Sequence, residues 1–168
     1  MSNFVVDCES DGPIPNLYSL VCFGAVKVED LSNTFYGKVK PISDNYLPEA
    51  LAISGFTREE HLLFDDPKTV MTNFIKWVES SNSNGRPIFW SDNPAYDWQF
   101  INYYTHYYCG KNPFGFSARR IGDLACGLFK DLRYKWKHLR KTKHTHNPVD
   151  DSIGNAEALI ELIKKIEA

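Results

Sequence analysis

The fold is decided by the stretch Phe4-Val5-Val6-Asp7-Cys8-Glu9-Ser10, an apolar and β-branched run that ends with acidic residues. Residues of this type favour strands, so residues 4–8 are predicted to form a buried strand. Asp7 and Glu9 are two positions apart, and their side chains therefore point to the same face of it. Neighbouring carboxylates near a core repel each other unless protons or a divalent cation compensate, and hard oxygen ligands suit Mg²⁺ or Mn²⁺. The alternative is a strand that has reached the surface.

Further elements follow from the spacing of apolar residues between turn signals. Gly12, Pro13 and Pro15 interrupt the chain after the first strand, and two more strand-like segments follow in quick succession. Strands in this arrangement are typical of an antiparallel meander. The predicted elements are strands 4–8, 18–28, 34–40 and 87–90 and helices 46–53, 67–79, 95–108, 119–129 and 149–166. This order, without internal repeats or a long linker, indicates one mixed α/β domain over residues 1–168 with a central sheet.

The composition is that of a folded, soluble protein. Hydrophobic residues make up 43% and charged residues 24% of the chain, which excludes disorder along its whole length. The net charge of −2 gives no indication of a nucleic-acid or membrane partner. We find no signal segment, no run near the roughly 18 apolar residues of a membrane span and no CxxC pair among the four cysteines. We therefore expect a cytoplasmic protein with reduced thiols.

Two further polar motifs lie at the ends of predicted elements. Asn93-Pro94-Ala95-Tyr96-Asp97 directly follows the strand 87–90, which places Asp97 near the start of a helix, where ligands of α/β sheets collect. His146 lies five residues before Asp151, which falls in the first turn of the last helix. A histidine near a metal cluster suits a general base, because its pKa lies near the working pH. Each motif alone also has a structural explanation, since the helix dipole favours acids in a first turn.

Together the three motifs resemble, in order, context and spacing, those of the DnaQ-like 3′–5′ exonucleases of the DEDDh type. They are Asp7-x-Glu9, Asn93-x-x-x-Asp97 and His146-x-x-x-x-Asp151. The resemblance covers residues 4 to about 163, and Ile53-Ser54-Gly55-Phe56-Thr57 is similar to a glycine-containing segment of these enzymes. It implies a ribonuclease-H-like three-layer fold, whose central mixed sheet has three antiparallel strands, then parallel strands, and is flanked by helices. Cys8 and Ser10 stand where the family usually has threonines.

The resemblance implies a two-metal mechanism. Carboxylates hold two Mg²⁺ (or Mn²⁺) ions about 3.5–4 Å apart, which activate water and stabilise the oxygens of an in-line displacement at phosphorus. The implied ligands are Asp7, Glu9, Asp97 and Asp151, with Asp7 as the bridge. His146 is expected to take the proton of the attacking water, so that a nucleoside 5′-monophosphate leaves from the 3′ end. Loss of Asp7 or Asp151 is expected to abolish turnover and leave the fold intact, because removing an acid relieves repulsion.

Residues that flank this site in the family are candidates for contact with the terminal nucleotides. Aromatic side chains among them suit single strands, because they stack on bases. For Tyr18 and Phe56, packing in the core explains the residue type equally well. The expected substrate contacts are Ser10, Asp11, Gly12, Leu17, Tyr18, Phe56 and Asn93.

The segment 130–143 is strongly basic. It contains seven basic residues and one acid, a charge of +6, whereas the rest of the chain has 12 basic and 20 acidic residues, a charge of −8. The segment leads directly to His146. We expect Lys137, Arg140 and Lys141 to bind phosphates beside the metal ions. The alternative is a solvated loop, since charge runs are commonly no more than that.

The sequence thus predicts a metal-dependent 3′–5′ exonuclease of single-stranded nucleic acid. RNA is favoured over DNA, because stand-alone domains of this size resemble the RNA-trimming members of the family. DNA exonucleases of the proofreading or phage type share the motifs and stay open as an alternative. So do a catalytically idle RNA-binding module of the same fold and a hydrolase of small phosphodiesters. No membrane partner is expected, and a homodimer is compatible with the resemblance, because some relatives build the substrate groove across a dimer.

Overall fold

A five-stranded sheet forms the middle layer of the computed structural model, which describes residues 1–167. Its strands are β1 (Asn3–Ser10), β2 (Leu20–Lys27), β3 (Asp30–Lys38), β4 (Ile88–Ser91) and β5 (Ala118–Arg120). They lie side by side in the order β3-β2-β1-β4-β5. The first three are antiparallel, whereas β4 pairs in parallel with both β1 and β5. The predicted meander and mixed sheet are therefore confirmed.

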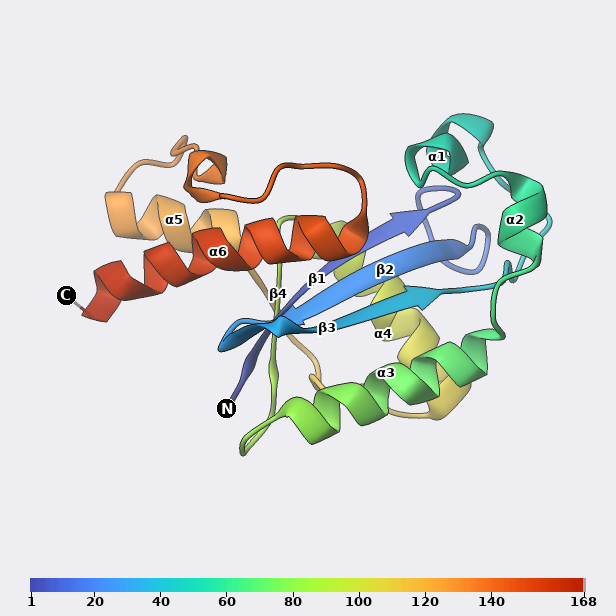
Figure 1. Cartoon of the computed structure of the whole chain (residues 1–168), viewed down its shortest axis with the longest axis horizontal. Coiled ribbons are helices and arrows are strands. Elements are labelled where there is room, and N and C mark those ends of the chain that lie inside the picture. Colours follow the sequence, from blue (N-terminus) through green and yellow to red (C-terminus); the bar gives the residue numbers. More distant parts are fainter. Residues whose placement is uncertain (168) are drawn as a thin grey trace.

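Helices cover both faces of the sheet (Figure 1). One face carries α3 (Pro67–Ser81) and α4 (Pro94–Cys109), and the other carries α5 (Ile121–Phe129) and α6 (Pro148–Glu167). The short helices α1 (Pro48–Ile53) and α2 (Arg58–Leu62) follow β3, and one 3₁₀ turn, η1 (Lys137–Leu139), lies between α5 and α6. Among residues 1–167, no helix has the length and apolar character needed to cross a membrane.

The alternation of side chains along β1 separates two apolar cores. Phe4 and Val6 point into the core beneath α3 and α4, while Val5 points into the core beneath α5 and α6. Asp7 and Glu9 have the same parity as Val5. The two acids therefore emerge on the face that α6 covers.

One predicted helix begins later than expected. A helix was predicted over 119–129, but α5 begins at Ile121. Residues 118–120 instead pair in parallel with β4 at the edge of the sheet. Three residues are too few to show the period of a strand. β5 can therefore be recognised only from its pairing with β4 in the structure.

The third strand and the segment that follows it also differ from the prediction. The strand predicted over 34–40 runs instead from Asp30 to Lys38, because Asp30 already pairs with β2 across a tight turn. Helix α2 is absent from the prediction, although Thr57 and Glu60 form a capping box at its start. Its five residues are too few to show helical periodicity.

The first turn of α6 rests directly on β2. Gly24 pairs with Asp7 in the sheet, and a Cβ atom at Gly24 would lie 2.3 Å from backbone atoms of Pro148 and Val149. The Ser152 hydroxyl in the next turn donates to the Gly24 carbonyl at 3.0 Å. The missing side chain of Gly24 thus lets the start of α6 approach the sheet beside Asp7.

Candidate active site

Four carboxylates from three elements form one cluster at the start of α6. Asp7 and Glu9 come from β1, Asp97 from the first turn of α4 and Asp151 from the first turn of α6. Asp97 and Asp151 are buried, whereas Asp7 and Glu9 are partly exposed. The charges of the other three carboxylates all act on Asp7. The fold therefore brings together the acids of all three sequence motifs.

A backbone hydrogen bond holds Asp97 against β1. The N–H of Cys8 donates to Asp97 Oδ1 at 3.0 Å. Asp97 also donates its own backbone N–H to the Asn93 carbonyl at 3.0 Å, within the first turn of α4. Because Cys8 lies between Asp7 and Glu9, these bonds place the acid of α4 next to the acids of β1.

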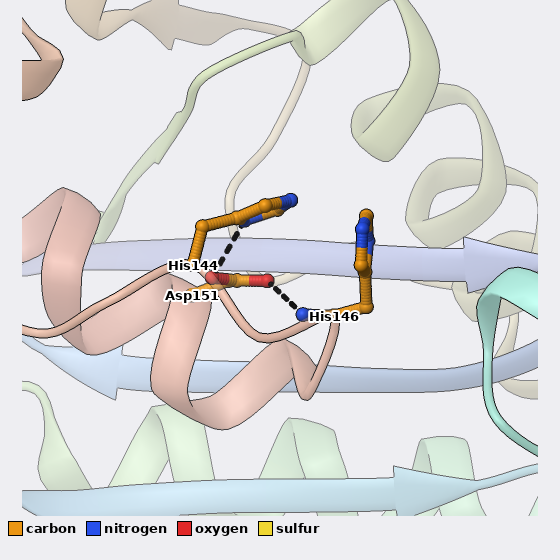
Figure 2. Close-up of side chains that lie close together, drawn as sticks. All are labelled: His144, His146 and Asp151. Carbon is orange, nitrogen blue, oxygen red and sulfur yellow. Dashed lines mark hydrogen bonds and ion pairs between the residues drawn. The ribbon is translucent and has the colours of Figure 1, made fainter.

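The loop before α6 wraps around the carboxylate of Asp151. Arg140 Nη2 donates to Oδ1 at 2.8 Å, and the backbone N–H of His146 donates to Oδ2 at 3.0 Å. His144 Nδ1 lies 2.8 Å from the same Oδ1. Figure 2 shows the rings of the two histidines next to each other beside the carboxylate. Their centroids are 4.3 Å apart.

Arg140 is an internal cation. Its side chain is only 7% exposed and lies against Gly154, where a Cβ atom would come within 2.5 Å of Arg140 Nε. That Nε atom has no hydrogen-bond partner among residues 1–167. The guanidinium group is paired with Asp151, yet Arg140 also lines a hollow of about 310 Å³ beside His144, so phosphate binding by Arg140 stays a prediction.

Burial and mutual repulsion raise the pKa values within the cluster. Burial raises the pKa of Asp7 well above its usual range, and the charges of Asp97 and Glu9 raise it further. Burial also raises the pKa of Glu9 to about 7, with contributions from Asp151 and Asp97. The pKa of Asp97 rises to about 7 through burial, although hydrogen bonds to its carboxylate oppose the shift. Protons or cations must therefore neutralise part of the cluster at neutral pH.

The donor atoms of the cluster fit divalent cations. Carboxylate oxygens are hard ligands of the kind that Mg²⁺ and Mn²⁺ prefer, and bound cations would relieve the repulsion. The structure also brings one ligand atom each from His144, His146 and Asp151 within 4.8 Å of one another. Imidazole nitrogens widen the range of suitable ions to transition metals.

His146 lies at the edge of the cluster. Its φ of 60° is in the left-handed region, and the bond from its N–H to Asp151 holds this conformation. Its Nδ1 atom is 3.7 Å from Glu9 Oε1, while the side chain is 52% exposed. An imidazole placed between carboxylates and solvent can accept a proton from a molecule that enters the site.

Asp11 anchors loops within the protein. Its side chain is fully buried, and its oxygens accept hydrogen bonds from Ser19 N at 2.5 Å and from Arg58 Nη1 at 2.9 Å. Arg58 also donates to the Ser43 carbonyl at 2.7 Å, so the ion pair joins three segments. The predicted nucleotide contact of Asp11 is wrong, because none of its side chain reaches the surface.

Ser10 and Gly12 are buried as well. The Ser10 hydroxyl donates to the Gly12 carbonyl at 2.6 Å and contacts the Tyr96 hydroxyl. The ring of Tyr18 lies where a side chain at position 12 would be. Ser10 and Gly12 thus support the loop from beneath, whereas Tyr18 is partly exposed, and contact of Ser10 and Gly12 with substrate stays a prediction.

The other predicted substrate contacts lie nearer the surface. Leu17 is 46% exposed, and Asn93 is exposed at the start of α4. Phe56 packs edge-on against Phe64 at a centroid distance of 4.9 Å, and the Lys38 ammonium lies 4.8 Å from its centroid. Contact of Leu17, Tyr18, Phe56 and Asn93 with substrate stays a prediction.

Lys137 and Lys141, the other two basic residues predicted to bind phosphate, differ in their surroundings. Lys137 Nζ lies 2.6 Å from Asp92 Oδ2. The backbone N–H of Lys141 donates to Glu157 Oε2 at 2.8 Å, and the residue is exposed. Phosphate binding by Lys137 and Lys141 stays a prediction.

His144 and Asp92 stand outside the residues predicted from the sequence. For His144 a signal exists in the His-x-His spacing, because residues two apart in extended chain reach the same side. Asp92 has no such signal, since its partner Lys137 is distant along the chain.

Solved structures of similar fold identify the fold class. Cell-death related nuclease 4 (CRN-4) matches with a TM-score of 0.77 and 15% identity, over 97% of this chain and 64% of its own. The nuclease domain of 3′hExo, a DEDDh family member bound to rAMP, matches with a TM-score of 0.76 and 16% identity, over 97% of this chain and 92% of its own. This confirms the predicted ribonuclease-H-like fold of exonucleases.

Sequence similarity identifies the family. No protein-family model matches the sequence. The 3′–5′ DNA exonuclease Cap18 of Escherichia coli is 33% identical over 156 residues, which cover 92% of this chain and 82% of Cap18. The chain therefore belongs to the DEDDh family of 3′–5′ exonucleases, which are hydrolases of phosphodiester bonds.

Proposed function

We propose that this chain removes nucleoside 5′-monophosphates from the 3′ end of single-stranded DNA, with two Mg²⁺ or Mn²⁺ ions held by the four clustered carboxylates. The observation that carries this proposal is the convergence of acids from β1, α4 and α6 on one cluster with raised pKa values. Bound ions would activate a water molecule and stabilise charge on the phosphate oxygens.

The four carboxylates are proposed to act as metal ligands, and different contacts hold them in place. Asp7 is proposed as the bridging ligand, because the charges of the other three all act on it. Asp97 is held by the N–H of Cys8, and Asp151 by Arg140 and the loop before α6. Ligands fixed in this way need little reorganisation when the substrate binds.

His146 is proposed as the general base that takes the proton of the attacking water. Its position beside Glu9 and its exposure to solvent support this role. The His146→Ala variant is expected to lose about 10²–10⁴-fold in kcat, the range for general-base catalysis. Its affinity for Mn²⁺, measured by calorimetry, is expected to stay within about threefold of the wild type, because the carboxylates supply most of the ligands. Unchanged kcat would contradict this role.

The proposed DNA substrate rests on the relative Cap18, which is named as a DNA exonuclease. RNA, the substrate favoured from the sequence, is the second candidate, and the rAMP bound to 3′hExo supports it. The choice between them depends on how the site treats the 2′-hydroxyl group, which only RNA carries.

The proposal is tested with 5′-labelled DNA and RNA of identical sequence, incubated with Mg²⁺, with Mn²⁺ and with EDTA. We expect DNA to shorten from the 3′ end in either metal and to stay intact in EDTA. The Asp7→Asn variant is the matched control and is expected to leave the DNA intact. Faster shortening of RNA would assign RNA as the substrate. Retention of both strands without cleavage would favour the idle binding module instead.

Two other expectations from the sequence are retained as proposals. A homodimer is tested by light scattering of the purified protein with and without an oligonucleotide. A cytoplasmic location is tested by cell fractionation.

A further inference from the structure

Side chains of α5 and of the segment that follows it line a groove. Both elements are orange in Figure 1. Its outer part has a volume of about 690 Å³ and lies between α5 and residues 130–136. Its inner part has a volume of about 520 Å³ and lies between the end of β4 and residues 134–137. Arg120, Tyr134 and Trp136 line both parts, so the two parts adjoin, and together they are named here the α5 groove.

The inner end of the α5 groove lies at the start of α4. Asp92 and Asn93 line it, and Asn93 lies in the same helical turn as Asp97. Lys137 lines the groove and also a smaller hollow of about 310 Å³ that extends to His144. The groove thus ends within one helical turn of Asp97, a member of the carboxylate cluster.

The charge of the α5 groove is positive. Its two acids are already paired, Asp92 with Lys137 at 2.6 Å and Asp123 with Arg120 at 3.3 Å. Three more basic side chains are exposed along it and form no ion pair within residues 1–167. These are Lys130, Arg133 and Lys135.

The aromatic rings of the groove are engaged within the protein. Tyr134 stacks on Phe129 with ring centroids 3.8 Å apart, and its ring also meets His138 edge-on at 5.9 Å. Trp136 is 5% exposed and belongs to the core beneath α5 and α6. The groove therefore offers cations for phosphates and little aromatic surface on which bases could stack.

We propose that the α5 groove binds the backbone of the substrate strand on the 5′ side of the cleaved phosphodiester, through Lys130, Arg133 and Lys135. The inference rests on the proposed function, because a strand whose 3′ end lies at the carboxylates continues away from them. Phosphate contacts fix the register of a strand and carry no base information. The groove therefore strengthens the binding of long strands whatever their sequence.

The test compares single-stranded DNA of 20 and of 4 nucleotides with the same 3′ end. The Lys130→Gln/Arg133→Gln variant is expected to raise KM for the 20-mer by about tenfold and to change KM for the 4-mer by less than about twofold, with kcat unchanged. The slope of log(kcat/KM) against log[salt] for the 20-mer should fall in magnitude by about 1.4, the value for two phosphate contacts on a single strand. Oligo-dA and oligo-dT should be affected equally.

The Lys68→Gln/Lys76→Gln variant is the matched control. It removes the same charge from exposed positions on α3, which covers the opposite face of the sheet, and is expected to leave KM for both lengths unchanged (Figure 1). Equal effects of the two double variants would assign the loss to net charge and overturn the inference. So would an equal loss for both strand lengths, or a loss confined to one base.

Fluorescence anisotropy in EDTA separates this inference from the proposed function, because it measures binding without cleavage. If wild-type protein fails to cleave DNA or RNA but the groove variant still weakens binding of the 20-mer relative to the control variant, the groove stands and the proposed function fails. If the wild type cleaves and the groove variant binds both lengths as the wild type does, the groove inference is wrong and the function stands.

Discussion

At the residue scale, Asp7 and Asp151 belong to the same cluster but have opposite electrostatic surroundings. Asp7 faces other carboxylates, and burial and their charges raise its pKa. Asp151 is buried with Arg140 at 2.8 Å and forms a charge-paired unit with it. A neutral side chain at position 7 therefore relieves repulsion, whereas one at position 151 leaves the arginine buried without a counter-charge.

The Asp7→Asn variant is expected to be at least as stable as the wild type in metal-free buffer. Its free energy of unfolding at pH 7 should rise, because burial and the neighbouring carboxylates destabilise the ionised form of Asp7 and an asparagine carries no charge. Urea denaturation measures this change. An unfolded Asp7→Asn protein would remove the basis for assigning Asp7 as a metal ligand.

The Asp151→Asn variant is expected to lose about 3–5 kcal/mol of stability, the usual cost of breaking a buried ion pair from one side. This revises the expectation from the sequence that the fold tolerates the loss of either acid. Arg140→Met should cost a similar amount, and the double variant less than the sum of the two. Additive losses in the double-mutant cycle would show that the two side chains do not interact.

At the element scale, the site depends on how closely α6 approaches the sheet. Asp7 and Gly24 are neighbours in the β1–β2 pair, and the backbone of Pro148 lies directly on Gly24. Asp151 is one turn further along α6. The height of α6 above β2 therefore sets the position of Asp151 relative to Asp7.

The Gly24→Ala variant is expected to push α6 away from the sheet. A Cβ atom 2.3 Å from backbone cannot be relieved by a side-chain rotation, so we expect a loss of about 3 kcal/mol in stability together with most of the exonuclease activity. Gly127→Ala in α5 is the matched control. A Cβ atom there meets nothing within 4 Å, and the helix should gain slightly from alanine. Equal urea midpoints for the two variants would contradict the close approach of α6.

At the scale of the whole molecule, stability depends on pH through a buried histidine far from the motifs. His61 of α2 is fully buried next to Asp11 and Arg58. Burial, and then the charge of Arg58, lower the pKa of His61 to about 4. Between about pH 6.5, the usual pKa of histidine, and the lowered pKa of the folded state, His61 therefore binds a proton in the unfolded chain but not in the folded chain.

The folded protein is thus expected to lose stability as the pH falls from about 6.5 to about 4. The loss attributable to His61 approaches roughly 3 kcal/mol at the lower limit, at about 1.4 kcal/mol per pKa unit. The comparison is with His61→Gln, which removes the titration, in urea unfolding between pH 4 and pH 8. Parallel curves for the two proteins would show that His61 does not contribute.

Much of the sheet and the acids of the site were predictable because their signals are local. The alternation in β1, the turn residues after it and the stripe of α6 each lie within one short window. The strand β5 and the helix α2 were not predicted, because three and five residues are too few to show a period. The ion pairs of Asp11 and Arg140 were not predicted, since their charged side chains gave no sign of the partners Arg58 and Asp151.

The sequence by itself determined the class of fold, the parity that puts Asp7 and Glu9 on one face, and the family motifs. Only the tertiary structure decided which charges remain available for substrate. Side chains of opposite charge attract each other across loops, and burial strengthens the attraction. Which of them pair therefore depends on their distances in space, and residue type does not specify these distances. In the basic segment, Arg140 and Lys137 are paired with acids, while Lys130, Arg133 and Lys135 face the α5 groove.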